Sequence, residues 1–368
     1  MKVLVMGGTS FNGLALVREL AKTGHSVTVC NRGKTDAAIP FGVARIACDR
    51  TDEKALRSAL GGRDFDVVFD ISGYTPNDVE WMVDLFKGRT GHYVFASSTV
   101  IYAPSNLLPI TEDHPVDRGP RQNGYGMNKL LCEDILLREW REHGFPCSIV
   151  AFSMVFGPNN IIPDREQRMF VRMVKGRKVL IPGDGTTLGM VGHVDDQARA
   201  MRMMMQNPRT FGRRYNLTGG DYYSDEGYVD TIADVTGRGA ENVEKVFVPP
   251  ALMDDLYAGK VVLGGRSSGT TSDVRASFDP RSAQLFKLQS LVQRLAPNLH
   301  HWNRSVLFSI ERLKQDTGWA PEFTFRSAVE HTWEWFQREG LAETRDFDFS
   351  FEDELLARIE GPASAGGA

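Results

Sequence analysis

The sequence has few cysteines, and none is spaced as in a metal site or a disulfide framework. The cysteines form no CxxC pair and have no histidine at ligand spacing. We therefore expect no metal and interpret the four as small, buried apolar residues: Cys30, Cys48, Cys132 and Cys147.

Long apolar runs are also absent. No window approaches the roughly 18 uninterrupted apolar residues of a membrane span. The apolar run at residues 3–6 is too short for the core of a signal peptide and leads directly into glycines. We therefore expect a cytoplasmic protein with no membrane partner.

A surplus of positive charge is missing as well. The 368 residues include 43 Lys and Arg against 47 Asp and Glu, which gives a net charge of −4 with neutral His. Binding to a phosphate backbone normally needs a basic face, so we expect no nucleic-acid partner. With 42% hydrophobic residues, the chain is typical of one large or two coupled globular domains.

Short apolar runs alternate with amphipathic stretches over residues 1–157. This order is typical of βαβ units and predicts an α/β fold with a doubly wound, mostly parallel sheet. The six predicted strands are KVLVM, HSVTVCN, ARIACD, DVVFDIS, HYVFASS and CSIVAFSMVFG. Beyond them the pattern is less regular. Residues 264–273, rich in Gly, Ser and Thr, predict a mobile loop, and the tail GPASAGGA predicts disorder.

The first predicted strand runs into a glycine-rich turn that opens a helical pattern. Glycine lets backbone N–H groups approach a pyrophosphate, and a helix N-terminus adds a positive dipole end. We therefore predict a dinucleotide site, with a tight turn that binds no ligand as the alternative. The residues assigned to it are Gly7, Thr9, Ser10, Phe11, Asn12 and Gly13.

The ends of the second and third predicted strands carry further cofactor candidates. Sites for NAD usually place an acid after the second strand, whereas an Arg accommodates the 2′-phosphate of NADP. Asn31 stands in the acid's place beside Arg32. We therefore predict NAD(P) with a preference for NADP, and exposed loop charges are the alternative. Asp49 and Arg50 lie where an adenine contact is expected, or form a turn acid with an ion-paired neighbour.

Tyr125 and Lys129 lie four residues apart in a helical stretch, so their side chains project from one face. Redox chemistry at an alcohol needs a proton carrier, and a neighbouring ammonium favours the phenolate of a tyrosine. We predict that Tyr125 takes the alcohol proton and that Lys129 lowers the pKa of Tyr125 and binds the nicotinamide ribose. Ser98, which ends the strand HYVFASS, would hold the substrate oxygen. A surface Tyr/Lys pair is the alternative.

These motifs resemble the NAD-dependent epimerase/dehydratase family of the extended short-chain dehydrogenase/reductase superfamily. The resemblance spans residues 1 to about 338 and rests on GGTSFNG at 7–13, FASSTVIY at 95–102, YGMNK at 125–129, VFGPNN at 155–160, PGDGTT at 182–187, GHVDD at 192–196 and TGWAP at 317–321. It implies a Rossmann-type cofactor domain, a smaller discontinuous C-terminal substrate domain, and a homodimer through the helices near 77–88 and 125–143.

The implied division assigns residues 1–157 and 190–220 to the cofactor domain, 158–189 and 221–340 to the substrate domain, and 341–368 to a C-terminal extension with a disordered tail. By position in the family, Ser72 and Gly73 are implied to contact the cofactor. The implied substrate contacts, besides Ser98, are Tyr74, Thr99, Met154 and Arg165.

Several positions depart from the pattern of family members that act on nucleotide sugars. Met154 stands where these members carry an Asn that contacts the substrate phosphate, and Gly189-Met190 stands where they often carry an Arg-Asp pair. Thr99-Val100 replaces the acidic pair of 4,6-dehydratases, and the segment SGYTPND is short. These departures imply a substrate with less charge than a nucleotide sugar and disfavour sugar dehydration.

We predict an NAD(P)-dependent epimerase or oxidoreductase that acts on a secondary alcohol or ketone of a sugar or sugar-like substrate, free or linked to a nucleotide or nucleoside. An NADPH-dependent ketone reductase without epimerisation is one alternative. Another is an RNA-binding protein of the chloroplast stem-loop-binding type, which the departures favour and the net charge opposes. A catalytically idle NADP sensor is opposed by the complete set of Ser98, Tyr125 and Lys129.

Overall fold

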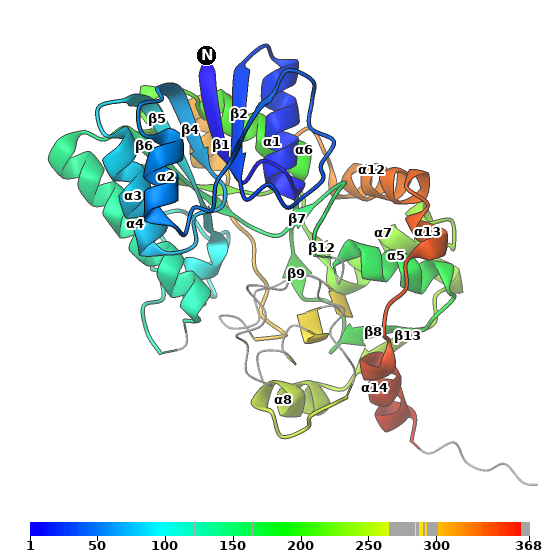
Figure 1. The fold of residues 1–368 in the computed structure, drawn as a ribbon. Coiled ribbons are helices and arrows are strands. Elements are labelled where there is room, and N and C mark those ends of the chain that lie inside the picture. The colour runs from blue at the N-terminus through cyan, green and yellow to red at the C-terminus, as the bar shows by residue number, and fades with distance from the viewer. Residues whose placement is uncertain are drawn as a thin grey trace, which may run out of the picture. The chain divides into compact units, whose positions relative to one another are not determined.

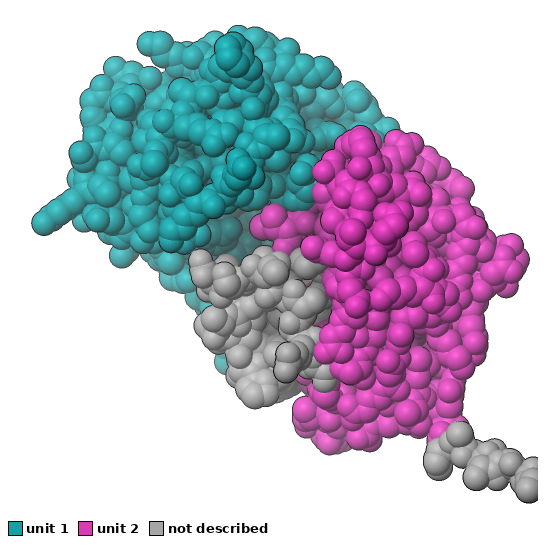
Figure 2. All heavy atoms as spheres, turned by 45° about the vertical axis from the view of Figure 1, so that its right-hand side comes forward, with its two compact units in different colours: residues 1–159, 192–220, 308–323 teal, residues 160–191, 221–307, 324–368 magenta. Residues whose placement is uncertain are grey.

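A computed structural model describes residues 1–120, 122–162, 165–264, 284, 287–289, 291–292 and 301–361 (Figure 1). The chain divides into two compact units, coloured in Figure 2. Unit 1 comprises residues 1–159, 192–220 and 308–323, and unit 2 comprises residues 160–191, 221–307 and 324–368. The predicted mobile loop beyond Gly264 and the predicted disordered tail beyond Gly361 lie outside the described residues.

Unit 1 is built on a seven-stranded sheet in the order β11-β6-β5-β4-β1-β2-β3, with every neighbouring pair parallel. This order confirms the predicted doubly wound, Rossmann-type sheet. Its strands are β1 Lys2–Met6, β2 Ser26–Asn31, β3 Ala44–Ala47, β4 Phe65–Asp70, β5 Thr90–Ser98, β6 Cys147–Phe152 and β11 Arg213–Leu217.

Alternate side chains of each central strand enter different cores. In β1, Val3 and Val5 belong to one apolar cluster, and Leu4 and Met6 belong to the other. All four are buried, because β1 lies mid-sheet with both faces covered. This explains why the strand reads as a continuous apolar run rather than as alternating apolar and polar residues.

Helices cover both faces of the sheet. On the face of Val3 and Val5, the core includes side chains from α1 and α6, and on the face of Leu4 and Met6 it includes side chains from α2, α3 and α4. The helices of unit 1 are α1 Phe11–Lys22, α2 Glu53–Leu60, α3 Pro76–Phe86, α4 Gly124–His143, α6 Val194–Met204 and α11 Glu311–Thr317. Its shorter elements are η1 Thr99–Ile101, η2 Pro208–Thr210, and the parallel pair β7 Val155–Phe156 and β10 Gly192–His193.

A late segment of the chain, residues 308–323, belongs to unit 1, whereas the sequence division grouped it with residues 221–340. Trp319 is buried, and its indole N–H donates to the Asp196 carbonyl at 3.1 Å. Tyr215 on β11 donates to Asp316 at 2.7 Å. Such contacts join residues about 100 positions apart, which local sequence patterns do not report.

Unit 2 combines short strand pairs with helices. Strands β8 and β13 are parallel, and strands β9 and β12 are antiparallel. The elements of unit 2 are α5 Glu166–Val174, β8 Val179–Pro182, β9 Leu188–Gly189, β12 Tyr223–Ser224, α7 Asp225–Val235, η3 Ala240–Asn242, β13 Lys245–Val248, α8 Pro250–Ala258, α12 Phe325–Arg338, α13 Leu341–Thr344 and α14 Ser350–Glu360.

None of the helices in the described ranges of either unit is both long enough and apolar enough to span a membrane.

The C-terminal extension contributes to the packing of unit 2. Phe351 and Leu355 of α14 lie in its apolar core. Glu352 accepts from Arg168 Nε at 2.9 Å and forms an ion pair with Arg172, and all three side chains are buried. Because a buried charge needs a partner, these pairs join α14 to α5.

Candidate active site

The predicted cofactor and catalytic residues of unit 1 gather at the carboxyl ends of the parallel strands. Strand β1 lies between β4 and β2, so the chain direction around the sheet reverses there. Open parallel sheets bind ligands in the crevice at such a switch point. The glycine turn follows β1, and Ser72 and Gly73 follow β4, so these predicted cofactor residues lie on the two sides of this point.

The glycine turn leaves no room for side chains at its tightest positions. Gly7 has φ +93°, and a Cβ there would lie 2.9 Å from Ser72 Cβ. A Cβ on Gly13 would lie 2.5 Å from the Gly7 carbonyl oxygen, and one on Gly8 would lie 2.7 Å from Val17 Cγ2. Backbone rather than side chains therefore lines this turn, which fits the close approach of a dinucleotide pyrophosphate.

The remaining residues of the turn lie directly before α1 or in its first turn. Ser10 precedes the helix as its N-cap without a side-chain cap bond, and Phe11 has a φ of 38°. Thr9 is buried and its Oγ1 accepts from Asn31 Nδ2 at 3.1 Å. Asn12 Oδ1 is buried and has no hydrogen-bond partner in the described part of the chain. The N-terminus of α1 thus lies in the turn, next to a buried acceptor atom that has no donor within the described residues.

The predicted cofactor residues at the end of β2 and after β3 form different local hydrogen bonds. Asn31 Oδ1 accepts from the Gly33 N–H at 2.8 Å, which fixes the start of the loop, and Arg32 is exposed. Asp49 accepts from the Thr51 N–H and hydroxyl at 3.1 and 2.8 Å, and these bonds lower the pKa of Asp49. Asp49 therefore forms a local turn at the end of β3.

Arg50, predicted beside Asp49 at the adenine, lies in an ion-pair cluster. It pairs with Asp70 at 2.5 Å and with Asp78 at 3.2 Å. Asp70 also accepts from the Tyr93 hydroxyl at 2.6 Å. Burial by itself would raise the pKa of Asp70, but the Arg50 guanidinium overcomes this effect and lowers it. Arg50 is therefore ion-paired to the residue that ends β4 and to a residue in the first turn of α3.

Lys129 on α4 binds both the segment that follows β4 and strand β5. Its buried ammonium donates to the carbonyls of Gly73 and Ala96, at 2.7 and 2.6 Å. The Nζ atom also lies 4.7 Å from the centroid of the Phe95 ring. Burial lowers the pKa of Lys129 to about 8, although the nearby Asp70 carboxylate opposes the shift. Lys129 is thus a cation whose proton is held less tightly than usual.

Tyr125 lies one helical turn before Lys129, in the first turn of α4. Asn123 caps this helix by accepting from the Gly126 N–H at 2.7 Å. Lys129 Nζ is 5.7 Å from the centroid of the Tyr125 ring, and the ring of Tyr74 is centred 6.4 Å from that of Tyr125. The structure therefore brings Tyr125, Lys129 and Tyr74 together.

The predicted substrate residues are distributed over both units. Ser98 ends β5, two residues after the Ala96 carbonyl that Lys129 binds, and its Oγ accepts from the Val100 N–H at 3.4 Å. Thr99 is buried in η1, and the Met154 carbonyl accepts from the Gly192 N–H at 2.9 Å. Arg165 instead precedes α5 as its N-cap and belongs to unit 2.

Sequence reasoning missed a second buried cluster behind Lys129. Glu133 lies on the same face of α4, one turn further along, and accepts from the Ser97 hydroxyl on β5. Its other oxygen accepts from Arg214 Nε on β11 at 2.7 Å. The sequence signal for Glu133 was its four-residue spacing from Lys129. Helical periodicity alone does not tell whether a charged residue at this spacing is buried or lies on a solvated helix face.

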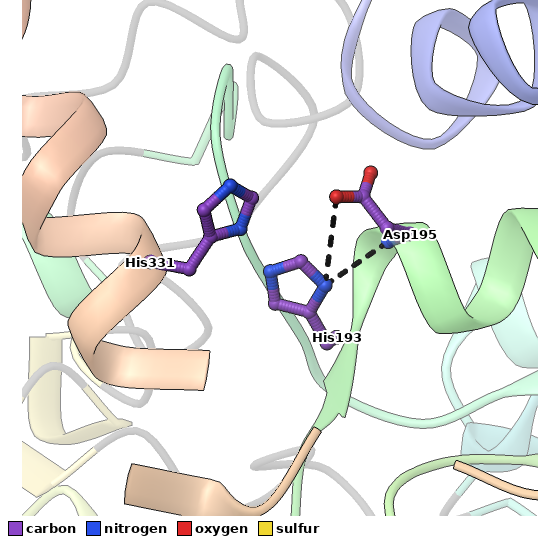
Figure 3. A group of neighbouring side chains, drawn as sticks. All are labelled: His193, Asp195 and His331. Carbon is purple, nitrogen blue, oxygen red and sulfur yellow. Dashed lines mark hydrogen bonds and ion pairs between the residues drawn. The ribbon is translucent and has the colours of Figure 1, made fainter. Parts of the chain in front are cut away.

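His193 caps α6 at the end of β10 (Figure 3). Its Nδ1 accepts from the Asp195 N–H at 3.2 Å, and its ring stacks on Phe323 with centroids 3.7 Å apart. The carboxylate of Asp196 accepts from the N–H groups of Glu322 and Phe323. These bonds attach the segment that includes Phe323 to the start of α6.

Comparisons with known proteins identify chains that are related to this one. The model of the NAD dependent epimerase/dehydratase family matches residues 3–218. The chloroplast stem-loop binding protein of 41 kDa b from Arabidopsis thaliana is 25% identical in an alignment of 370 positions, gaps included, which covers 97% of this chain and 84% of that protein. A UDP-glucose 4-epimerase from Corynebacterium glutamicum is 24% identical, over 90% of this chain and 95% of that protein.

Solved structures share the fold. The structure of a UDP-glucose 4-epimerase from Thermotoga maritima with UDP-glucose gives a TM-score of 0.68 at 18% identity, over 92% of this chain and 99% of that chain. At this identity the likeness concerns the fold alone.

The glycine turn yields the first prediction. Gly13→Ala places a Cβ 2.5 Å from the Gly7 carbonyl oxygen and must displace the turn, so we expect the Kd for NAD to rise at least about tenfold by calorimetry. Gly220→Ala is the matched control, because its nearest contact is Pro321 Cγ at 3.6 Å. Equal affinities in the two variants would contradict a cofactor site at this turn.

Proposed function

Because the chain belongs to the NAD-dependent epimerase/dehydratase family of extended short-chain dehydrogenase/reductases, we propose that it is an enzyme acting on a secondary alcohol or ketone of a sugar or sugar-like substrate. The observation that carries the proposal is the buried Lys129 ammonium, which donates to the carbonyls of Gly73 and Ala96 and lies beside the Tyr125 ring. The cofactor of the proposed reaction is NAD(P).

In this proposal Tyr125 moves the proton of the substrate hydroxyl. A neighbouring ammonium lowers the pKa of a phenol from its usual ~10, so Lys129 prepares Tyr125 to accept this proton. The Ser98 hydroxyl binds the substrate oxygen and holds it at Tyr125. NAD(P), when bound, supplies the two-electron exchange at the carbon that carries this oxygen.

Two outcomes share these residues. In the epimerase form, the substrate alcohol is first oxidised to a ketone. The ketone is then reduced to an alcohol of the opposite configuration, so the net redox change is zero. In the reductase form, a ketone substrate consumes one reduced cofactor for each turnover. Ser98, Tyr125 and Lys129 have the same roles in both.

The substrate is proposed to be a sugar or sugar-like molecule, with or without a nucleotide. The curated relative from Corynebacterium glutamicum is named for UDP-glucose. The apolar or small residues Met154, Gly189 and Met190, where nucleotide-sugar members carry polar ones, support a substrate with less negative charge.

RNA binding is the second candidate function. It is supported by the name of the relative from Arabidopsis thaliana, a stem-loop binding protein. The net charge of −4 weakens this candidate, because salt-sensitive binding to phosphates depends on clustered Lys and Arg.

Tyr125→Phe removes the proposed proton carrier and keeps the ring. We expect turnover of UDP-glucose, UDP-galactose or free aldoses to fall at least about 100-fold, because general acid–base catalysis contributes on that order. Product configuration is followed by NMR and NADPH loss by absorbance, which separates the two forms. The control is Tyr222→Phe, because Tyr222 is 64% exposed.

Near-normal turnover in Tyr125→Phe would show that the catalytic assignment is wrong. If that result came with tight binding of a stem-loop RNA that weakens steeply with salt, the second candidate function would be favoured instead.

The proposed role of Lys129 predicts an alkaline limit. Its lowered pKa of about 8 means that the ammonium loses its proton as the pH rises through this value, so we expect kcat/KM to decline there. Between this pH and ~10.4 the unfolded chain holds a proton that the folded chain has lost, so stability should rise with pH.

Lys129→Arg keeps the positive charge over this range, so the decline should disappear even where the rate is lower. Lys260→Arg, at a side chain that is 72% exposed, is the control. The same alkaline decline in Lys129→Arg and in the wild type would exclude Lys129 as its source.

The preference for NADP is proposed from Asn31 and Arg32. Arg32→Ala should weaken NADP binding about tenfold and leave NAD binding nearly unchanged, because only NADP offers a 2′-phosphate to the guanidinium. Calorimetric Kd values for both cofactors measure this, with Lys34→Ala as a control on the same exposed loop. Unchanged discrimination between NAD and NADP would show that Arg32 does not set the cofactor preference.

A further inference from the structure

The segment Ile71–Thr75, here called the β4–α3 loop, is bound by carboxylates at both of its ends. Asp70 precedes it at the end of β4, and Asp78 follows it in the first turn of α3. The N–H groups of Tyr74 and Thr75 both donate to Asp78 Oδ2 at 2.9 Å. Asp70 is completely buried, so a change in its pairing would disturb the beginning of the loop.

Arg50 joins the two carboxylates and uses every donor it has. Its Nη1 and Nη2 donate to Asp70 at 2.5 and 2.9 Å. Its Nε donates to Asp78 Oδ1 at 3.2 Å, and Nη2 also donates to the Asp78 carbonyl at 2.9 Å. Nη1 also donates to Ser72 Oγ at 3.1 Å. These bonds account for the five N–H groups of a guanidinium, and none is left for a ligand.

The β4–α3 loop in turn contacts Lys129. The Gly73 carbonyl accepts from Lys129 Nζ at 2.7 Å, and the Tyr74 ring centroid lies 4.9 Å from the same nitrogen. A Cβ on Gly73 would lie 3.0 Å from Asp70 Oδ2, so the loop backbone packs directly on the Arg50–Asp70 pair. A displacement of this pair would therefore move the carbonyl that holds the ammonium.

We propose that Arg50 is a positioning residue: it holds the β4–α3 loop so that Gly73 and Tyr74 set the Lys129 ammonium beside Tyr125. This inference rests on the proposed function, and it replaces the predicted adenine contact of Arg50. Its physical basis is the planar fork of Arg, which reaches Asp70, Ser72 and Asp78 together. A lysine, with one nitrogen, reaches fewer of them.

The test separates positioning from folding through its variants. Arg50→Met alone would leave Asp70 as an unpaired buried charge, so it is combined with Asp70→Asn to remove both charges. Arg50→Lys retains the charge without the fork. Arg57→Met is the control, because Arg57 forms ion pairs with exposed side chains of Glu53 and Asp84.

Two readouts need no turnover. The first is amide hydrogen exchange at Tyr74 and Thr75, which we expect to become at least tenfold faster in the double variant and to stay unchanged in Arg57→Met. The second is the Kd of 5′-AMP, a probe of the adenosine half alone, which we expect to stay within twofold of the wild type. An adenine contact by Arg50 would instead weaken AMP binding at least tenfold.

The third readout is kinetic. We expect kcat to fall at least 30-fold in the double variant with the KM for the sugar within threefold. Arg50→Lys should fold with a wild-type melting temperature to within a few degrees and still lose at least tenfold in kcat.

Unchanged exchange in a folded double variant, AMP binding weakened tenfold, or full kcat in Arg50→Lys would each overturn the inference. If the wild type turns over no sugar, the proposed function fails while exchange and AMP binding still decide the role of Arg50.

Discussion

The buried ammonium of Lys129 is the interaction on which the candidate active site depends. It binds the carbonyl of Gly73 in the segment after β4 and the carbonyl of Ala96 near the end of β5, the neighbouring parallel strand. Removing a charge from water costs free energy unless its donors are paired, and the lowered pKa of Lys129 reflects this cost. The helix that carries Lys129 must therefore lie where both carbonyls are within reach.

A second buried charge on α4 strengthens this constraint. Glu133, one turn after Lys129, accepts from Ser97 on β5 and pairs with Arg214 on β11. A shift of α4 along its axis would break bonds at both turns and leave buried charges unpaired, which is far more costly than losing an exposed pair. Tyr125, one turn before Lys129, takes its position from this attachment.

Much of the fold could be predicted because its signals are local. The apolar run of β1 and the glycines after it occur within the first 13 residues, and their order already indicates a strand, a turn and a helix. The shared face of Tyr125 and Lys129 follows from helical periodicity. Non-local pairs could not be predicted: Arg50 lies 20 and 28 positions from the two acids it binds, and either acid reads equally well as a surface residue.

The sequence by itself determined the doubly wound sheet, the glycine turn and the spacing that puts Tyr125 and Lys129 on one helix face. Backbone sterics and the periods of strand and helix act over a few residues and are written in local patterns. Only the tertiary structure decided that Arg50 lies in an ion-pair cluster with Asp70 and Asp78, and that residues 308–323 belong to unit 1. Pairing of buried charges and packing of distant side chains depend on which segments meet, and they meet only once the chain has folded.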